Sequence, residues 1–276
     1  MTAPSMPPDI PVEFVAMAAL AVLGSVGTFV AMVRRHWQGT ALVRQADAGP
    51  VTWDGADVAW IIAVALVLQT LAVSLGPQPP PLERQLVAGM LATACAAAIA
   101  VLHLRRRGAS WAMLGFHVAD WPAAVRQALG TVLLVVAPLL ALAAFLDRIV
   151  PYRHPLVEFL AEHRDAASLA IVWLAATVTA PIVEEFFFRR ILQGWLETRL
   201  TGMIGAARAG GLAIAGAALA FALAHLGQGL AWVPLTALGI VLGILARQTG
   251  SIVPGILAHA LFNAVSVVLV LMQPAP

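Results

Sequence analysis

The chain has 276 residues, of which 61% are hydrophobic and only 11% are charged. This apolar share exceeds that of ordinary soluble domains and is typical of integral membrane proteins. The formal net charge is only +2, and no basic block with interleaved aromatic residues is present, which excludes a nucleic-acid-binding protein. The single cysteine, Cys95, excludes an intrachain disulfide framework.

Eight apolar runs follow one another along the chain. A helix needs about 20 residues to cross ~30 Å of hydrocarbon, and the runs lack the alternating pattern of a barrel strand. The predicted fold class is therefore all-α, a polytopic membrane bundle of about eight transmembrane helices. The predicted spans are residues 14–33, 58–76, 86–104, 128–146, 167–183 or beyond, 209–226, 230–246 and 252–272.

A polar segment, residues 149–165, separates the fourth and fifth spans. Its charged residues predict a surface helix or loop with a solvated face. Two of its side chains, His154 and His163, could bind a metal ion. Their spacing, however, does not bring them to one face of a helix, so the segment is interpreted as a connection ahead of the fifth span.

The fifth run contains an acid pair, Glu184 and Glu185, followed by Arg189. A charged side chain near the bilayer centre costs ~2.5–3.5 kcal/mol even on the mildest insertion scale, so membrane proteins tend to keep one only for use. Residues four apart share a helix face, whereas adjacent residues point about 100° apart. Glu185 and Arg189 can therefore pair, either to brace the site or as a purely structural ion pair. Glu184 is left free to act as a general base.

Other features of the last three runs add polar groups to this acid pair. Pro181 lies one turn before the pair and predicts a kink or loosened hydrogen bonds. Glu184 lies about 20 residues before the polar break at 202–205 and His225 about 20 after it, so an antiparallel hairpin brings the two to a similar depth. His259 and Asn263 are four residues apart and share one stripe of an apolar helix, which favours an inward, functional face over simple interhelical bonding.

These side chains together fit the chemistry of hydrolysis. Glu184, with help from His225, would activate a water molecule, and His259 and Asn263 would stabilise the oxyanion formed at a peptide carbonyl. Two histidines and a glutamate also match the ligand count of a catalytic zinc site. The chain lacks the His-Glu-x-x-His helix of common zinc proteases, and asparagine is a poor zinc ligand. A divalent metal such as zinc therefore stays open as a cofactor, and metal-independent water activation is favoured.

Three motifs of the chain are Glu184-Glu185-x-x-x-Arg189, Phe221-x-x-x-His225 and His259-x-x-x-Asn263. In order and spacing they resemble the motifs of the CPBP family, the CAAX proteases and bacteriocin-processing or immunity proteins, also called abortive-infection membrane proteins. The resemblance implies an all-helical intramembrane endopeptidase. It also implies that Glu184 is the catalytic base helped by His225, that His259 and Asn263 form the oxyanion pocket, and that Glu185 and Arg189 support them. Members of this family are often labelled metalloproteases.

This resemblance divides the chain into two parts. Residues 1–150 are expected to form about four transmembrane helices without an assignable motif, and residues 166–272 a CPBP-like catalytic core. The expected partners are a membrane-associated or lipidated, CAAX-like peptide or protein substrate and membrane lipids. A non-catalytic bacteriocin immunity or scaffold protein is the alternative. A small-solute transporter is less favoured, because no inverted repeat is evident.

The arginine-rich composition bears on where the protein resides. All 16 basic residues are arginine and none is lysine, and alanine is abundant. This bias is typical of a GC-rich bacterial genome. We therefore expect an integral, multi-pass protein of the bacterial cytoplasmic membrane.

Overall fold

The computed structural model describes residues 12–39, 50–75 and 81–272, and within these ranges every regular element is a helix. The all-α prediction is therefore confirmed. In chain order the helices are α1 (Val12–Trp37), α2 (Gly55–Ser74), α3 (Leu82–Arg106), α4 (Trp121–Asp147), α5 (Pro155–Glu162), α6 (Ala166–Leu174), η1 (Ala175–Thr179), α7 (Ala180–Glu184), η2 (Glu185–Leu192), α8 (Gln193–Ile204), α9 (Ala206–Leu223), α10 (Trp232–Thr249) and α11 (Val253–Leu271).

Eight candidate membrane spans lie in the described part of the chain, when α6 to α8 are taken as one continuous helix. This number matches the prediction, and each predicted run overlaps one span. The fifth span is much longer than its apolar run, since it extends over Ala166–Ile204 and has 39 residues. It continues past the acid pair because neighbouring helices bury its polar side chains, including Arg189 and Arg190.

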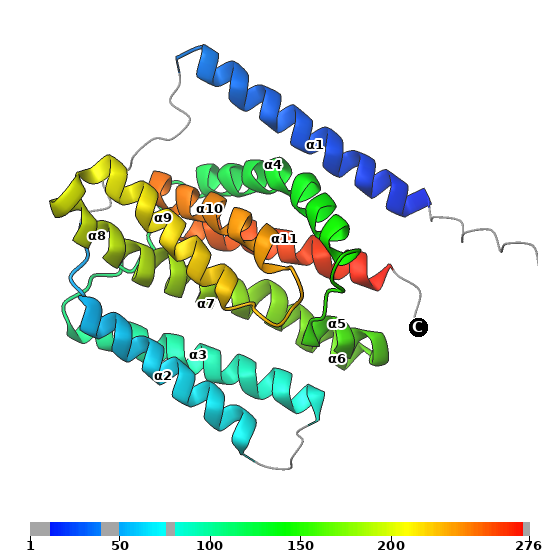
Figure 1. Ribbon diagram of the computed structural model, residues 1–276, viewed down its shortest axis with the longest axis horizontal. Coiled ribbons are helices and arrows are strands. Elements are labelled where there is room, and N and C mark those ends of the chain that lie inside the picture. The colour runs from blue at the N-terminus through cyan, green and yellow to red at the C-terminus, as the bar shows by residue number, and fades with distance from the viewer. Residues whose placement is uncertain (1–11, 40–49, 76–80, 273–276) are drawn as a thin grey trace, which may run out of the picture.

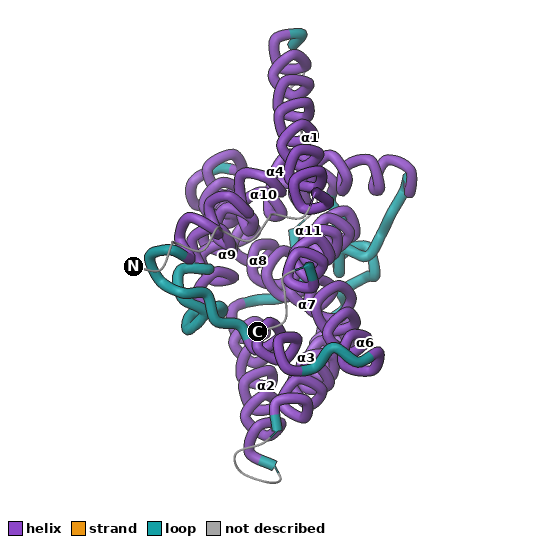
Figure 2. The backbone as a smooth tube through the Cα atoms, turned by 90° about the vertical axis from the view of Figure 1, so that its right-hand side faces the viewer, coloured by secondary structure: helices purple, strands orange, loops and turns teal. Residues whose placement is uncertain are grey.

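Helix α11 is the element around which the site is organised, because it contacts α4, α10, η1 and α7. Helices α8 and α9 form an antiparallel hairpin, and α10 packs against α9. The α2–α3 hairpin lies on the opposite side of the bundle from α1 (Figure 1). Helix α1 packs on the outside against α4, as the turned view also shows (Figure 2).

Two segments outside the long helices hold η2 in place. The indole Nε1 of Trp53, just before α2, donates to the carbonyl of Ile191 at 3.1 Å. Arg190 donates through Nε to the carbonyl of Met113 in the α3–α4 connection. Apolar residues of both segments pack against η2 in one buried cluster that includes Val51, Trp53, Ala109, Leu114, Phe186, Ile191 and Ile252. The helical turn that follows the acid pair is therefore anchored to the rest of the fold.

The two π-helical segments of the fifth span flank the short helix α7 that contains Pro181. Proline has no N–H to donate, and its ring clashes with the carbonyl four residues earlier. The helix widens ahead of it, and the N–H of Ala180 bonds to the carbonyl of Ala175, five residues back. The loosening that Pro181 predicts is therefore confirmed. Such π turns are rare and occur frequently at functional sites.

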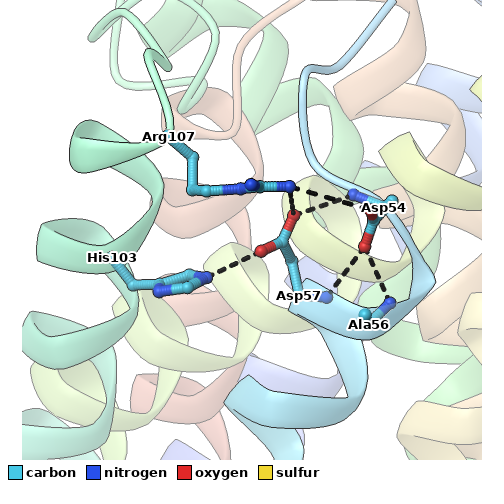
Figure 3. A network of polar contacts seen from close by, with 5 residues as sticks. All are labelled: Asp54, Ala56, Asp57, His103 and Arg107. Atoms are coloured by element: carbon cyan, nitrogen blue, oxygen red, sulfur yellow. Dashed lines mark hydrogen bonds and ion pairs between the residues drawn. The ribbon is translucent and has the colours of Figure 1, made fainter.

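A polar network ties the start of α2 to the end of α3 (Figure 3). The buried carboxylate of Asp57 lies 2.7 Å from His103 Nε2 and 3.3 Å from an Arg107 nitrogen. It also accepts the N–H of Asp54, whose own carboxylate caps the helix. The ring of Trp60 stacks on that of His103 at 4.3 Å between centroids. Since every group here has a partner, the network is interpreted as a structural clamp of the α2–α3 hairpin.

Replacing Asp57 by alanine should loosen this clamp. The change removes the acceptor for His103, Arg107 and a backbone N–H, so we expect a loss of about 1–2 kcal/mol of stability. Thermal unfolding of the purified protein in detergent measures the loss. Glu83→Ala is the control, because Glu83 is an exposed acid in the first turn of α3. An equal melting temperature for both variants would contradict the structural role of Asp57.

Candidate active site

The acid pair lies where the helix type changes, since Glu184 ends α7 and Glu185 begins η2. Glu185 is fully buried, and its Oε2 lies 3.3 Å from Nε of Arg189. The side chain of Glu184 is 24% exposed. The Glu185–Arg189 ion pair that the spacing predicts is therefore present, and Glu184 is the partly exposed acid of the two.

The imidazole of His259, on α11, lies between the two carboxylates. Its Nδ1 is 3.1 Å from Oε1 of Glu185, and its Nε2 is 3.6 Å from Oε2 of Glu184. The first distance is that of a hydrogen bond, whereas the second is too long for one. Oε1 of Glu185 thus has a hydrogen-bond partner, whereas among the described residues its Oε2 has only the ionic contact with Arg189. Glu184 is in electrostatic contact with the ring without a hydrogen bond to it.

The ring of Phe221 connects α9 to this cluster. Phe221 is fully buried, and the guanidinium carbon of Arg189 lies 4.5 Å from its centroid. The rings of His225 and His259 meet Phe221 edge-on, at centroid distances of 4.9 and 5.8 Å. An aromatic face attracts a cation, most strongly where water is excluded. Phe221 therefore makes a cation–π contact with Arg189, and its ring is in contact with the rings of both His225 and His259.

His225 follows the end of α9 and is half-buried. Its Nδ1 lies 2.8 Å from the carbonyl oxygen of Phe221. A carbonyl can only accept a hydrogen bond, so Nδ1 must be the nitrogen that carries the proton. In the neutral ring, Nε2 is then an unprotonated acceptor, which suits a group that takes a proton from water.

Asn263 lies one turn beyond His259 on the same face of α11 and is half-buried. Its Nδ2 donates to the carbonyl of Ala176 at 2.8 Å. Ala176 belongs to η1, where the helix hydrogen bonds are shifted. The π turn therefore provides the acceptor that orients the amide.

The predicted site residues do not all meet in the same way. Ionic contacts join Glu184, Glu185, Arg189 and His259, and His225 joins them through Phe221. Asn263 is bonded to η1, and the described contacts do not link it directly to the acid pair. Its place next to the cluster follows from its position on α11.

Sequence reasoning missed the glycine that makes room for the buried acid. A Cβ added at Gly255 would lie 3.0 Å from Oε2 of Glu185. Gly255 precedes His259 by four residues, so it shares the helix face of His259 and Asn263. Its spacing from His259 could therefore have identified Gly255 as part of the site. No feature of the sequence could have identified the carbonyl of Ala176 as the acceptor for Asn263, since this bond depends on the π turn.

The side chains of the site do not fit a metal centre. Among the described residues, no group of three or more His, Cys, Asp or Glu side chains could hold a metal ion. Both nitrogens of His259 face carboxylates, and Nδ1 of His225 is bonded to a carbonyl. His154 and His163, the other candidate metal ligands, lie at opposite ends of α5, where Nδ1 of His154 bonds to Leu156 and Nδ1 of His163 to Phe159.

Comparison with known proteins gives a family match that covers the site. Residues 166–265 match the family model described as type II CAAX prenyl endopeptidase Rce1-like. The match begins with α6, ends in α11 and includes all six predicted site residues. No curated protein and no solved structure matches the chain.

The family match confirms the resemblance to the CPBP intramembrane proteases that the three motifs indicate. It supports a CAAX-type intramembrane endopeptidase in general. Together with the eight apolar helices of the described residues, it makes the chain an integral, multi-pass membrane protein.

Replacing Gly255 by alanine should disturb Glu185 without touching Glu184. The new Cβ would force Oε2 of Glu185 away by a few tenths of an ångström, and this oxygen faces Arg189. A small displacement of this kind in a positioned site lowers activity roughly tenfold or more. Peptide cleavage and thermal unfolding, measured on the same preparation, test the effect.

Gly130→Ala on α4 is the matched control, because nothing lies within 4 Å of a Cβ at that helical position. Alanine there should stabilise the helix by about 0.5–1 kcal/mol and leave cleavage unchanged. If Gly255→Ala were as active as Gly130→Ala, the close packing of Gly255 on Glu185 would have no functional importance.

Proposed function

We propose that this protein is an intramembrane endopeptidase that hydrolyses a peptide bond of a membrane-associated or lipidated, CAAX-like substrate with water activated by Glu184. The observation that carries this proposal is the unequal environment of the two acids. Glu185 is fully buried between Arg189 and His259, whereas Glu184 has an exposed fraction of 24% and lies beside the same imidazole. Glu185 is thus held by two partners, whereas Glu184 is partly exposed and makes no hydrogen bond to the imidazole.

In the proposed reaction, Glu184 takes a proton from the attacking water, and the free Nε2 of His225 helps to orient or deprotonate that water. The oxygen of the water bonds to the carbonyl carbon of the scissile peptide, and the carbonyl oxygen becomes an oxyanion. Asn263 would donate a hydrogen bond to this oxyanion, and His259 would donate one from Nε2 in its doubly protonated form, because its Nδ1 proton is already shared with Glu185. The C–N bond then breaks, and the proton held by Glu184 passes to the leaving amine.

The roles of Glu185 and Arg189 in this mechanism are supporting ones. With both ionised, their charges cancel within the buried pair, and Glu184 is the acid left outside that pair. The hydrogen bond that Nδ1 of His259 donates to Glu185 directs Nε2 of the same ring toward Glu184. We assign the catalytic core to residues 166–272, and we assign a framing role to the spans within residues 1–150.

Glu184→Gln tests the base directly. The substitution keeps the size of the side chain but removes its ability to take a proton, so we expect cleavage to fall about 100-fold or more. The assay is hydrolysis of a peptide library, with and without a prenyl group, by the purified protein in liposomes. Glu83→Gln, at an exposed acid of α3, should cleave as the wild type does. Equal cleavage by Glu184→Gln would remove Glu184 from the mechanism, and binding of a peptide without any cleavage would favour the immunity or scaffold alternative.

The arrangement of donors around His225 and His259 also gives an expectation for metal removal. Because Nδ1 of each imidazole is already bonded and the described residues form no group of three metal-ligating side chains, we expect a chelator to leave cleavage within about twofold of the untreated rate. Dialysis against a chelator, followed by cleavage with and without added zinc, provides the measurement. Loss of activity that zinc restores would require a metal-dependent mechanism instead.

A further inference from the structure

Helix α10 packs against η2 and against α9, beside which it lies in Figure 1, yet none of the predicted site residues belongs to it. From residue 232 to residue 246 it has no charged side chain. Its one hydroxyl in this stretch, on Thr236, donates to the carbonyl of Trp232 within the same helix. Two glycines one turn apart, Gly239 and Gly243, are both buried. Any influence of α10 on the site must therefore come from how closely these glycines let other helices approach.

Gly239 is the point at which α10 meets Phe221. A Cβ added at Gly239 would lie 3.3 Å from Cδ1 of the Phe221 ring and 3.0 Å from both Cα and Cβ of Ala218, three residues earlier on α9. All three distances are shorter than an ordinary van der Waals contact between carbon atoms. Gly239 lies within a regular α-helix, so space rather than backbone conformation requires a glycine here.

The ring of Phe221 is fully buried, and groups of the site surround the rest of it. The guanidinium carbon of Arg189 lies 4.5 Å from its centroid. The rings of Phe188, His225 and His259 meet it edge-on, at centroid distances of 5.4, 4.9 and 5.8 Å. Since protein interiors are close-packed, a ring that is pushed from the side of α10 has to move against these groups.

Arg189 depends on this ring because it has few other partners. Its side chain is fully buried, and within the described ranges none of its guanidinium nitrogens makes a hydrogen bond. Its charge is compensated by the carboxylate of Glu185 at 3.3 Å and by aromatic rings, of which Phe221 at 4.5 Å is nearer than Phe188 at 6.0 Å. A cation–π contact is strongest at short distance and where water is excluded. The place of the Phe221 ring therefore affects how well the buried charge of Arg189 is compensated.

Gly243, one turn further along α10, is packed as closely but against other groups. A Cβ there would lie 2.8 Å from Oε1 of Gln193 and 3.1 Å from Cγ2 of Ile214. Its carbonyl also accepts a hydrogen bond from Nε2 of Gln193 at 3.0 Å. Neither Gln193 nor Ile214 belongs to the site. Gly243 thus joins α10 to the fifth span, whereas Gly239 joins it to Phe221.

We propose that Gly239 is a further positioning residue of the hydrolytic site, whose missing side chain sets the place of the Phe221 ring against Arg189. Through the same ring it sets the places of the imidazoles of His225 and His259. This inference rests on the proposed function. Gly239 acts through Phe221 and touches none of the reacting atoms.

Gly239→Ala and Gly243→Ala form a matched pair of variants. Each adds one methyl group to the same helix at a closely packed glycine, so we expect both to lower the melting temperature in detergent. Only Gly239→Ala should lower kcat, roughly tenfold, since it displaces groups that are positioned for the reaction. KM should stay unchanged in both, because Phe221 is fully buried. A kcat of Gly239→Ala that equals or exceeds that of Gly243→Ala would overturn the proposal.

A second measurement detects the displacement of the ring without using activity. The ring current of Phe221 shifts the NMR signals of the His225 and His259 imidazoles, which meet it edge-on. These signals are assigned with His225→Gln and His259→Gln in protein labelled at its 7 histidines. We expect both signals to move in Gly239→Ala and to stay in place in Gly243→Ala. Unmoved signals in Gly239→Ala would contradict the coupling between α10 and the imidazoles.

The Phe221→Leu background tests whether Gly239 acts through the ring. Leucine is smaller and more flexible than phenylalanine, so it can yield to a methyl group added at Gly239. The fall in melting temperature caused by Gly239→Ala should therefore be smaller in this background, whereas the fall caused by Gly243→Ala should be the same with and without Phe221→Leu. If the cost of Gly239→Ala did not change, its packing against Ala218 would explain the effect, and the role of the ring would be overturned.

The outcomes distinguish this inference from the function on which it rests. If the wild type cleaves no faster than Glu184→Gln, the proposed hydrolysis fails and the inference fails with it. If the wild type cleaves and Glu184→Gln does not, the function stands. A wild-type kcat for Gly239→Ala would then overturn the role of Gly239 alone.

Discussion

The buried ion pair between Glu185 and Arg189 is the interaction on which the arrangement of the site depends. Both side chains are fully buried, and removing an ion from water costs several kcal/mol unless partners compensate it. Glu185 is compensated by Arg189 and by His259 of α11, and Arg189 also by the face of Phe221 of α9. Three elements distant in sequence are therefore held together, because moving any one of them would leave a buried charge short of a partner.

This constraint explains why two adjacent acids have different environments. The helix turns between them, so only one can face Arg189. Gly255 provides the space for the buried acid, and the anchored turn of η2 keeps Arg189 in register with it. Glu184 is left at the accessible edge of the cluster. The fixed pair thus positions the imidazole that the free acid faces.

Most of the fold and part of the site could be predicted from the sequence, because these features depend on residues close to one another along the chain. The eight spans follow from hydropathy, and the pairing of Glu185 with Arg189 follows from helical spacing. The approach of His225 to the acid pair followed from the length of one hairpin. The π turn after the acid pair, the 39-residue fifth span and the bond from Asn263 to Ala176 depend on packing between helices, which a single sequence does not contain. Similarly, His154 reads as part of a solvated segment, yet it is half-buried and caps α5 through its Nδ1.

The end of α9 determines where His225 lies among the apolar helices. α9 ends at Leu223, two residues before His225, and a connection of hydrogen-bonded turns replaces the helix from there on. Inside a bilayer such a backbone is tolerated only where protein buries it or water reaches it. The α4–α5 connection covers it on one side through the contact of Pro151 with Gly229. The same irregular segment therefore brings the His225 ring against Phe221, and its course depends on the shape of the neighbouring connection.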